Sequence, residues 1–155
     1  MRVVLLFVTV TVLGLQANIC AAPATRLVST NDVLVIDRCL SSVPGGKCTL
    51  TIGPLRPIGD FYCGEYATKI SPYFFKNEDG KLAILITRES IDKARNGLPV
   101  DITGTATENG KSRKSRRIDA TATPLDGRQG TLRLRFLADG REMVFETHYK
   151  FVASE

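Results

Sequence analysis

The sequence has 155 residues but only one histidine, no tryptophan and four cysteines, none of them in a CxxC pair. A metal site in a protein needs several His, Cys or carboxylate side chains that converge on the ion. The single histidine, His148, falls on the face of its predicted strand that is expected to meet solvent. Cys39, Cys48 and Cys63 are separated by 9 and 15 residues. We therefore expect no metal site.

Motifs of the common catalytic classes are also missing. The chain has no G-x-S-x-G sequence, and its adjacent glycines, Gly45 and Gly46, fall between two predicted strands rather than before a phosphate-binding helix. The lack of tryptophan removes a favoured sugar-stacking side chain. The catalytic alternatives are a cysteine paired with His148 or a pair of carboxylates among Asp60, Glu65, Asp101 and Asp119. Because no pattern groups these residues, we expect neither enzymatic activity nor a cofactor.

One long hydrophobic run is present, from Val3 to Leu15, and it is too short to cross a membrane. It has 13 residues, whereas a transmembrane helix needs about 20 and a signal-peptide core has about 7–15. Ala22 and Ala24 then form an A-x-A cleavage pattern. We interpret residues 1–24 as a cleavable signal peptide and residues 25–155 as a single domain, exported to the periplasm or the cell exterior, without a membrane span. The alternatives are a buried N-terminal strand, an uncleaved anchor or a lipidated Cys20.

Charge is distributed unevenly along the expected mature chain. Between Thr25 and Asn109 there are ten basic and ten acidic residues, whereas ten basic and six acidic residues follow. The densest part, called here the basic run, has five bases in seven residues: Lys111, Arg113, Lys114, Arg116 and Arg117. Such a run is a solvated loop, a protease-sensitive dibasic site or a patch that binds an anionic polymer or surface.

Turn-forming residues interrupt the chain at short intervals. Between them lie short stretches rich in Val, Ile, Thr, Phe and Tyr, a pattern typical of antiparallel sheet. We expect an all-β fold, an antiparallel meander of about eight to nine strands that forms a β-sandwich or a small barrel. The expected strands are residues 32–40, 47–53, 58–69, 72–77, 81–87, 99–107, 117–124, 130–137 and 141–152.

A single short helix is predicted near residues 90–96. Ser90 is placed to cap it, Asp92 lies in its first turn, and Gly97 ends it. The two strands that follow carry small Gly and Ala residues on one face, which would let the helix approach one end of the β-structure. The apolar residues expected to share the inner face of the helix are Ile91, Ala94 and Leu98.

The register of two hairpins can be tested against the hydrophobic pattern. A two-residue turn at Asp139–Gly140 pairs Phe136 with Met143 and places apolar residues on one face. A tight turn at Asn109–Gly110 would instead place basic residues on the apolar face. Because a slip of one residue reverses every side chain, we expect a longer loop or a bulge over residues 109–117.

Three cysteines remain after removal of the signal peptide, and exported proteins meet oxidising conditions. A four-residue loop at residues 54–57 would place Cys48 opposite Cys63, and a turn at residues 43–46 would place Cys39 on the same face as Cys48. The preferred disulfide is therefore Cys48–Cys63, followed by Cys39–Cys48. The alternative is three small buried side chains without a bridge.

The leading hypothesis is a non-enzymatic exported β-domain that binds an anionic envelope polymer or surface through the basic run. No aromatic residues lie between its bases, so we expect no specific binding of nucleic acid. The alternative function is a carrier for a small apolar ligand, held in a cavity inside the β-structure. Residues expected to line such a cavity are Leu132, Leu134, Phe136 and Phe145.

Replacing all five bases of the basic run with serine is predicted to weaken retention on immobilised heparin or polyphosphate, because each lost charge removes an attraction to the polyanion. The measurement is the salt concentration at which the wild type and the variant elute. Unchanged elution would contradict a binding role for the run.

Overall fold

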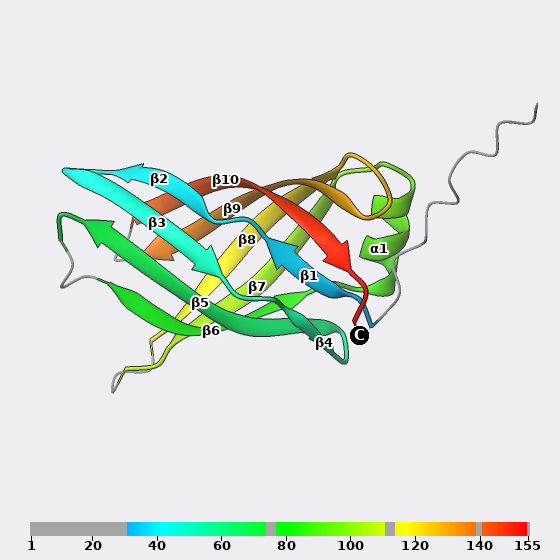
Figure 1. Ribbon diagram of the computed structural model, residues 1–155, viewed down its shortest axis with the longest axis horizontal. Coiled ribbons are helices and arrows are strands. Elements are labelled where there is room, and N and C mark those ends of the chain that lie inside the picture. The colour runs from blue at the N-terminus through cyan, green and yellow to red at the C-terminus, as the bar shows by residue number, and fades with distance from the viewer. Residues whose placement is uncertain (1–30, 74–76, 111–113, 139–140, 155) are drawn as a thin grey trace, which may run out of the picture.

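The computed structural model describes residues 31–73, 77–110, 114–138 and 141–154 (Figure 1). The expected signal peptide and two bases of the basic run lie outside these residues. The described chain is an antiparallel meander with one short helix, which confirms the expected fold class. Its elements are β1 (Val33–Ile36), β2 (Cys39–Val43), β3 (Gly46–Ile52), β4 (Arg56–Ile58), β5 (Phe61–Ser71), β6 (Glu78–Leu85), α1 (Arg88–Arg95), β7 (Val100–Glu108), β8 (Ser115–Pro124), β9 (Gln129–Ala138) and β10 (Arg141–Val152).

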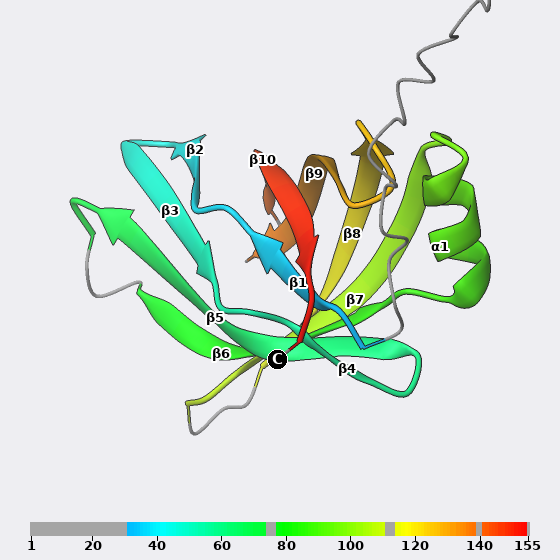
Figure 2. The same cartoon turned by 45° about the vertical axis from the view of Figure 1, so that its right-hand side comes forward.

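All ten strands belong to one sheet that curls into a half-barrel (Figure 2). The order is β1-β10-β9-β8-β7-β6-β5-β3-β2, and β4 pairs with β5. β1 pairs with β10 and β2 with β3, so this short segment of chain joins the two edges of the sheet. At the bend between β1 and β2 the backbone N–H of Asp37 donates to the carbonyl of His148 over 3.0 Å, and Leu34 exchanges two backbone hydrogen bonds of 2.9 Å with Leu55.

Three of the expected strands differ from those observed. Residues 32–40 form two strands, because the chain bends at Asp37 to leave β10 and join β3. A tight turn at Gly59–Asp60 separates β4 from β5, and the positive φ of Gly59, 63°, suits such a turn. The described part of residues 72–77 holds no strand, and Pro72 has no N–H to donate to a neighbouring strand.

The register predicted for the last hairpin is confirmed. Leu134 of β9 lies opposite Phe145 of β10, and both are fully buried. On the outer face Arg133 lies opposite Glu146, with Nε 3.9 Å from Oε1. An exposed cross-strand pair of this kind contributes about 0.2–1 kcal/mol, so the apolar face decides the register.

The connection between β7 and β8 is longer than a two-residue turn, as its basic residues predicted. Thr107 pairs with Ser115, so β8 begins two residues before the expected strand. One base nevertheless faces inward, since Arg116 lies opposite the buried Ala106. The expectation that the hydrophobic pattern would keep bases off this face is wrong at Arg116, because an acidic partner on β6 receives it.

That partner is Glu78, which forms an ion pair with the Arg116 guanidinium. The hydroxyl of Tyr66 donates a hydrogen bond to the same carboxylate. The side chains of Arg116 and Glu78 are only 16% and 14% exposed. Burial and the hydrogen bond to Glu78 raise the pKa of Tyr66, so its hydroxyl keeps the proton that it donates. The three residues form a polar cluster inside the half-barrel.

The helix begins earlier than predicted and has a different cap. Thr87 is the N-cap of α1, and its Oγ1 accepts a 3.2 Å hydrogen bond from the backbone N–H of Ser90. Ser90 therefore lies inside the first turn. Gly97, with φ 71°, follows the helix as expected. Leu98 lies beyond the helix and is 53% exposed, so its assignment to the inner face is wrong.

The predicted disulfides are absent, since Cys39, Cys48 and Cys63 are all free thiols. Cys39 and Cys48 are both buried on the inner face, as expected. Cys48 lies opposite Ile70 rather than Cys63, because β4 and its turn shift the register of β5. Cys63 alternates with the buried Tyr62 and faces outward. Burial, followed by the proximity of Cys48, raises the pKa of Cys39 to about 11, so this thiol acts as a small protonated core residue.

Replacing Arg116 with methionine or Glu78 with leucine is predicted to lower the free energy of unfolding by roughly 1–3 kcal/mol, because either change removes the ion-pair partner of a mostly buried charge. The double variant is predicted to lose much less than the sum of the two single losses. Urea unfolding of the wild type and the three variants measures this coupling. Additive losses would show that the buried charges do not depend on each other.

Candidate functional site

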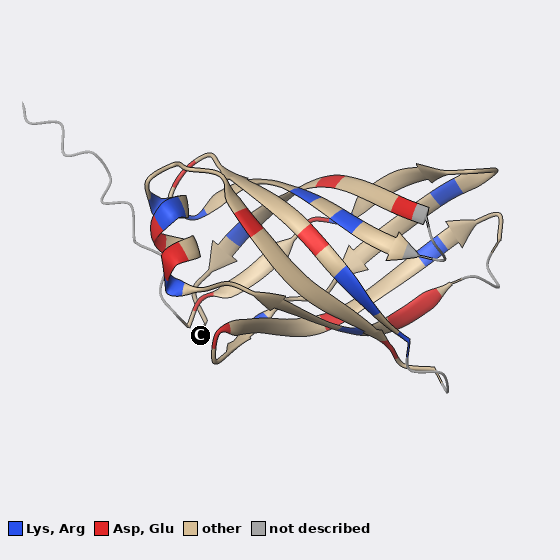
Figure 3. Ribbon diagram, turned by 180° about the vertical axis from the view of Figure 1, so that it is seen from behind, with Lys and Arg blue, Asp and Glu red and all other residues tan. Residues whose placement is uncertain are grey.

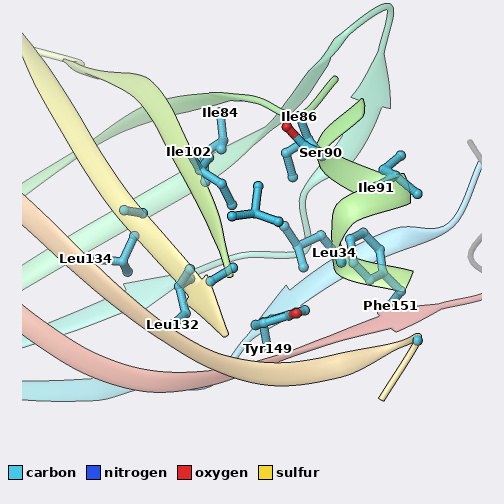
Figure 4. Close-up of a pocket in the computed structure, with 15 residues that line it drawn as sticks. Leu34, Ile84, Ile86, Ser90, Ile91, Ile102, Leu132, Leu134, Tyr149 and Phe151 are labelled. Carbon is cyan, nitrogen blue, oxygen red and sulfur yellow. The ribbon is translucent and has the colours of Figure 1, made fainter. Parts of the chain in front are cut away.

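An apolar cavity lies at the end of the half-barrel that α1 covers (Figure 4). Side chains from β1, β6, β7, β8, β9, β10 and α1 line it, and its volume is about 40 Å³. One water needs about 10–15 Å³, whereas pockets for drug-sized ligands hold about 300–1,000 Å³. With α1 in its observed position, the cavity therefore has room for a small group of atoms.

Small side chains on β8 explain why the interior is not filled here. Ala120 lies opposite Ile102 and Ala122 opposite Val100, and all four line the cavity. α1 packs over β7 and β8, as the small residues of these strands predicted. Larger residues at the two alanine positions would occupy the space between sheet and helix, because protein interiors are normally close-packed. The two alanines on β8 therefore account for the open space between the sheet and α1.

The cavity coincides only in part with the one expected from the sequence. Leu132 and Leu134 line it, as predicted for a carrier. Phe136 and Phe145 do not line it. Their rings pack edge to face, with centroids 5.9 Å apart, farther along the strands and away from α1. The space is thus confined to one end of the interior, and the aromatic residues fill the part beyond it.

α1 forms the outer wall of the cavity and is held mainly by two apolar residues. Ile91 and Ala94 are half-buried against the core, and no residue of the helix is fully buried. The shortest ion pair of the helix, Lys93 to Glu89 at 2.8 Å, lies within it. Separating the half-buried Ile91 and Ala94 from the core costs roughly 1–2 kcal/mol by the apolar area exposed. The helix is therefore suited to act as a lid.

Two hydroxyl groups interrupt the apolar lining, those of Ser90 and Tyr149 on opposite sides of the cavity (Figure 4). The Ser90 Oγ is 3.1 Å from the Thr87 Oγ1. Burial, followed by the charge of Asp126, raises the pKa of Tyr149, so its hydroxyl is protonated at neutral pH and can donate a hydrogen bond. None of the described lining residues is acidic or basic. The cavity favours an uncharged occupant, because an unpaired charge is costly to bury.

Beside the cavity, Tyr62 has a buried hydroxyl with no hydrogen-bond partner in the described part of the chain. Its ring packs edge to face on Phe151, a cavity residue, with centroids 5.9 Å apart. Burial, followed by the charge of Asp32, raises the pKa of Tyr62. A buried hydroxyl without a partner costs about 1–3 kcal/mol. Periodicity places Tyr62 on the inner face, but no sequence signal showed that its hydroxyl would lack a partner.

The described bases of the basic run do not gather on one surface. Lys114 is exposed, Arg116 is inside the half-barrel, and Arg117 forms an exposed ion pair of 2.8 Å with Asp119. Figure 3 shows Lys and Arg intermixed with Asp and Glu over the strands. The role of the basic run in binding stays a prediction, because two of its bases lie outside the described residues: Lys111 and Arg113.

The residues considered as catalytic alternatives lie apart from the cavity. His148 is exposed on the outer face of β10, where the sequence placed it. The described residues hold no group of three or more His, Cys, Asp or Glu side chains arranged to bind a metal ion. No helix in the described ranges is both long and apolar enough to cross a membrane.

Replacing Tyr62 with phenylalanine is predicted to raise the free energy of unfolding by about 1 kcal/mol, because the change removes an unpaired buried hydroxyl and keeps the ring. Urea unfolding measures the difference. Tyr66→Phe is the matched control, and it is predicted to destabilise because the Tyr66 hydroxyl donates to Glu78. A loss of stability in Tyr62→Phe as large as that in the control would contradict the assignment.

Comparison of the chain with protein-family models finds no match. Searches among curated proteins and among solved structures find no similar chain either. The functional argument therefore depends on the geometry of the cavity and on the chemistry of its walls.

Proposed function

We propose that the protein is a carrier that binds a small, uncharged apolar molecule in the cavity between α1 and the sheet. The observation that carries the proposal is an apolar cavity left open by two small residues of its sheet wall, Ala120 and Ala122. A hydrogen bond from Tyr149 would orient one polar atom of the occupant. We also propose that the protein is exported and non-enzymatic, on the grounds of its N-terminal hydrophobic run and its lack of catalytic motifs.

The energetic cost of the cavity supports an occupant. A cavity in a protein core costs about 24 cal/mol per Å³, so the observed 40 Å³ corresponds to about 1 kcal/mol. A leucine at position 120 would recover this energy through packing. An apolar ligand would recover it as well, because it restores the missing contacts with the walls.

Entry of a larger ligand requires α1 to move outward. The movement costs roughly 1–2 kcal/mol for Ile91 and Ala94, and a ligand that buries about 100 Å² of apolar surface offsets it with about 2.5 kcal/mol. The helix lies between Thr87 and Gly97, so these two positions are the natural hinges. The carrier would thus close over its ligand with the same two apolar residues that close the empty cavity.

Ala120→Leu is predicted to lower the affinity for N-phenyl-1-naphthylamine, a neutral fluorescent probe, by at least tenfold, because the leucine occupies the binding volume. Fluorescence titration measures the affinity. Ala122→Val fills part of the same space with a smaller side chain. It replaces Ala120→Leu in the titration if that variant does not fold. Thermal unfolding checks the fold of each variant.

The matched control is Thr103→Leu, which adds an apolar side chain to the exposed outer face of β7. It is predicted to bind the probe as the wild type does. If the wild type does not bind the probe, or if the filled and control variants bind it equally, the protein is not a carrier of this kind.

A further inference from the structure

A second hollow lies on the outer face of β8, β9 and β10, across the sheet from the apolar cavity. Its volume is about 560 Å³, within the range of pockets that hold small ligands. Its lining, unlike that of the cavity, is rich in hydroxyl and charged groups. The outward side chains that line it, called here the outer groove, are Thr121, Thr123, Thr131, Arg133, Arg135, Glu146 and His148.

The strand register arranges these side chains in rows. Thr123, Thr131 and His148 lie side by side across the three strands. Arg133 lies in the next row, between Thr121 and Glu146. Rows on one face are separated by about 6.6 Å and strands by about 4.8 Å. Threonine side chains are short and the surrounding side chains are long, so the groove has a hydroxyl floor with charged walls on the scale of one or two sugar rings.

The two arginines of the groove keep hydrogen-bond donors for a ligand. Nε of Arg133 is 3.9 Å from Glu146, and Nε of Arg135 is 4.0 Å from Glu142. Both separations exceed the usual limit of about 3.2 Å for an N–H···O hydrogen bond. Arg117, in contrast, donates to Asp119 over 2.9 Å. The guanidinium groups of Arg133 and Arg135 are therefore near carboxylates without being bonded to them.

The combination of guanidinium, hydroxyl and carboxylate groups in the outer groove favours one class of ligand. Guanidinium groups bind sulfate and phosphate esters through paired N–H donors. The exposed hydroxyls of Thr123 and Thr131 and the carboxylate of Glu146 suit the hydroxyl groups of a sugar. No Phe, Tyr or Trp side chain is among the described residues that line the groove, which disfavours a nucleobase because bases are usually held by stacking on such rings.

We propose that the outer groove binds an anionic saccharide, a sugar that carries a sulfate or phosphate ester. Arg133 and Arg135 bind the ester group, and the threonine hydroxyls with Glu146 hold the sugar hydroxyls. This site is separate from the apolar cavity and does not depend on the carrier function. It also differs from the basic run, because its two arginines project from β9 rather than from the β7–β8 connection.

The test is isothermal titration with a heparin-derived hexasaccharide at 150 mM NaCl. The double variant Arg133→Ser/Arg135→Ser is expected to bind at least tenfold more weakly than the wild type. The matched control, Arg56→Ser/Lys69→Ser, removes two exposed positive charges from β4 and β5 and is expected to change the affinity less than threefold. Thr123→Ala/Thr131→Ala, which keeps the charge, is expected to weaken binding about threefold or more.

Four outcomes would overturn the proposal. Equal losses in the groove and control variants would show attraction by net charge alone. Wild-type affinity in the threonine variant would show that these hydroxyls do not hold a sugar, and equal binding of the desulfated hexasaccharide would show that the groove does not recognise the ester group. Loss of binding in a variant with Lys111, Arg113 and Lys114 replaced by serine, with full binding in the arginine variant, would place the site on the β7–β8 connection. Thermal unfolding confirms that each variant is folded, and Arg133→Lys/Arg135→Lys replaces the serine variant if that one does not fold.

Discussion

The rest of the structure depends on the pairing of one short N-terminal segment with both edges of the sheet. β1 pairs with β10 and β2 with β3. The bend between β1 and β2 is held to β10 by two hydrogen bonds: the backbone N–H of Asp37 donates to the carbonyl of His148, and the hydroxyl of Thr147 donates to the carbonyl of Asp37. This pairing keeps the sheet curled. Curling separates the alternating side chains of every strand into an inner set, which must pack, and an outer set, which contacts solvent. The cavity belongs to the inner set and the groove to the outer set.

The two ends of the interior meet the packing requirement differently. Away from α1, aromatic rings and a mostly buried ion pair fill the space, with Tyr66 and Arg116 both bonded to Glu78. Under α1, alanine residues leave the space open, and a helix with no fully buried residue covers it. A buried charge tolerates little rearrangement, because separation from its partner is costly. Apolar contacts with a helix are non-directional and yield more easily. Movement is therefore expected at the helical end.

Features of the fold could be predicted where the turn residues and the alternation of apolar residues indicated the same strand pairing. The last hairpin has both a two-residue turn and a strict alternation of apolar residues, and its register was correct throughout. The cysteine register failed because the Gly59–Asp60 turn, hidden within an apparently continuous strand, displaced β5. The inward position of Arg116 was missed because Glu78 is 38 residues away in the sequence. The distribution of charges along the sequence does not show which acidic and basic side chains lie together in the folded protein.

The sequence by itself determined the all-β meander, the approximate place of α1 and the sheet face on which most strand residues lie, because these follow from turn chemistry and from a period of two residues. Only the tertiary structure decided where the interior is full and where it is empty. The cavity depends on the distance between Ile91 on α1 and Ala120 on β8, and the outer groove on the alignment of three strands. Such distances are set by the packing of the whole sheet, and no local pattern encodes them.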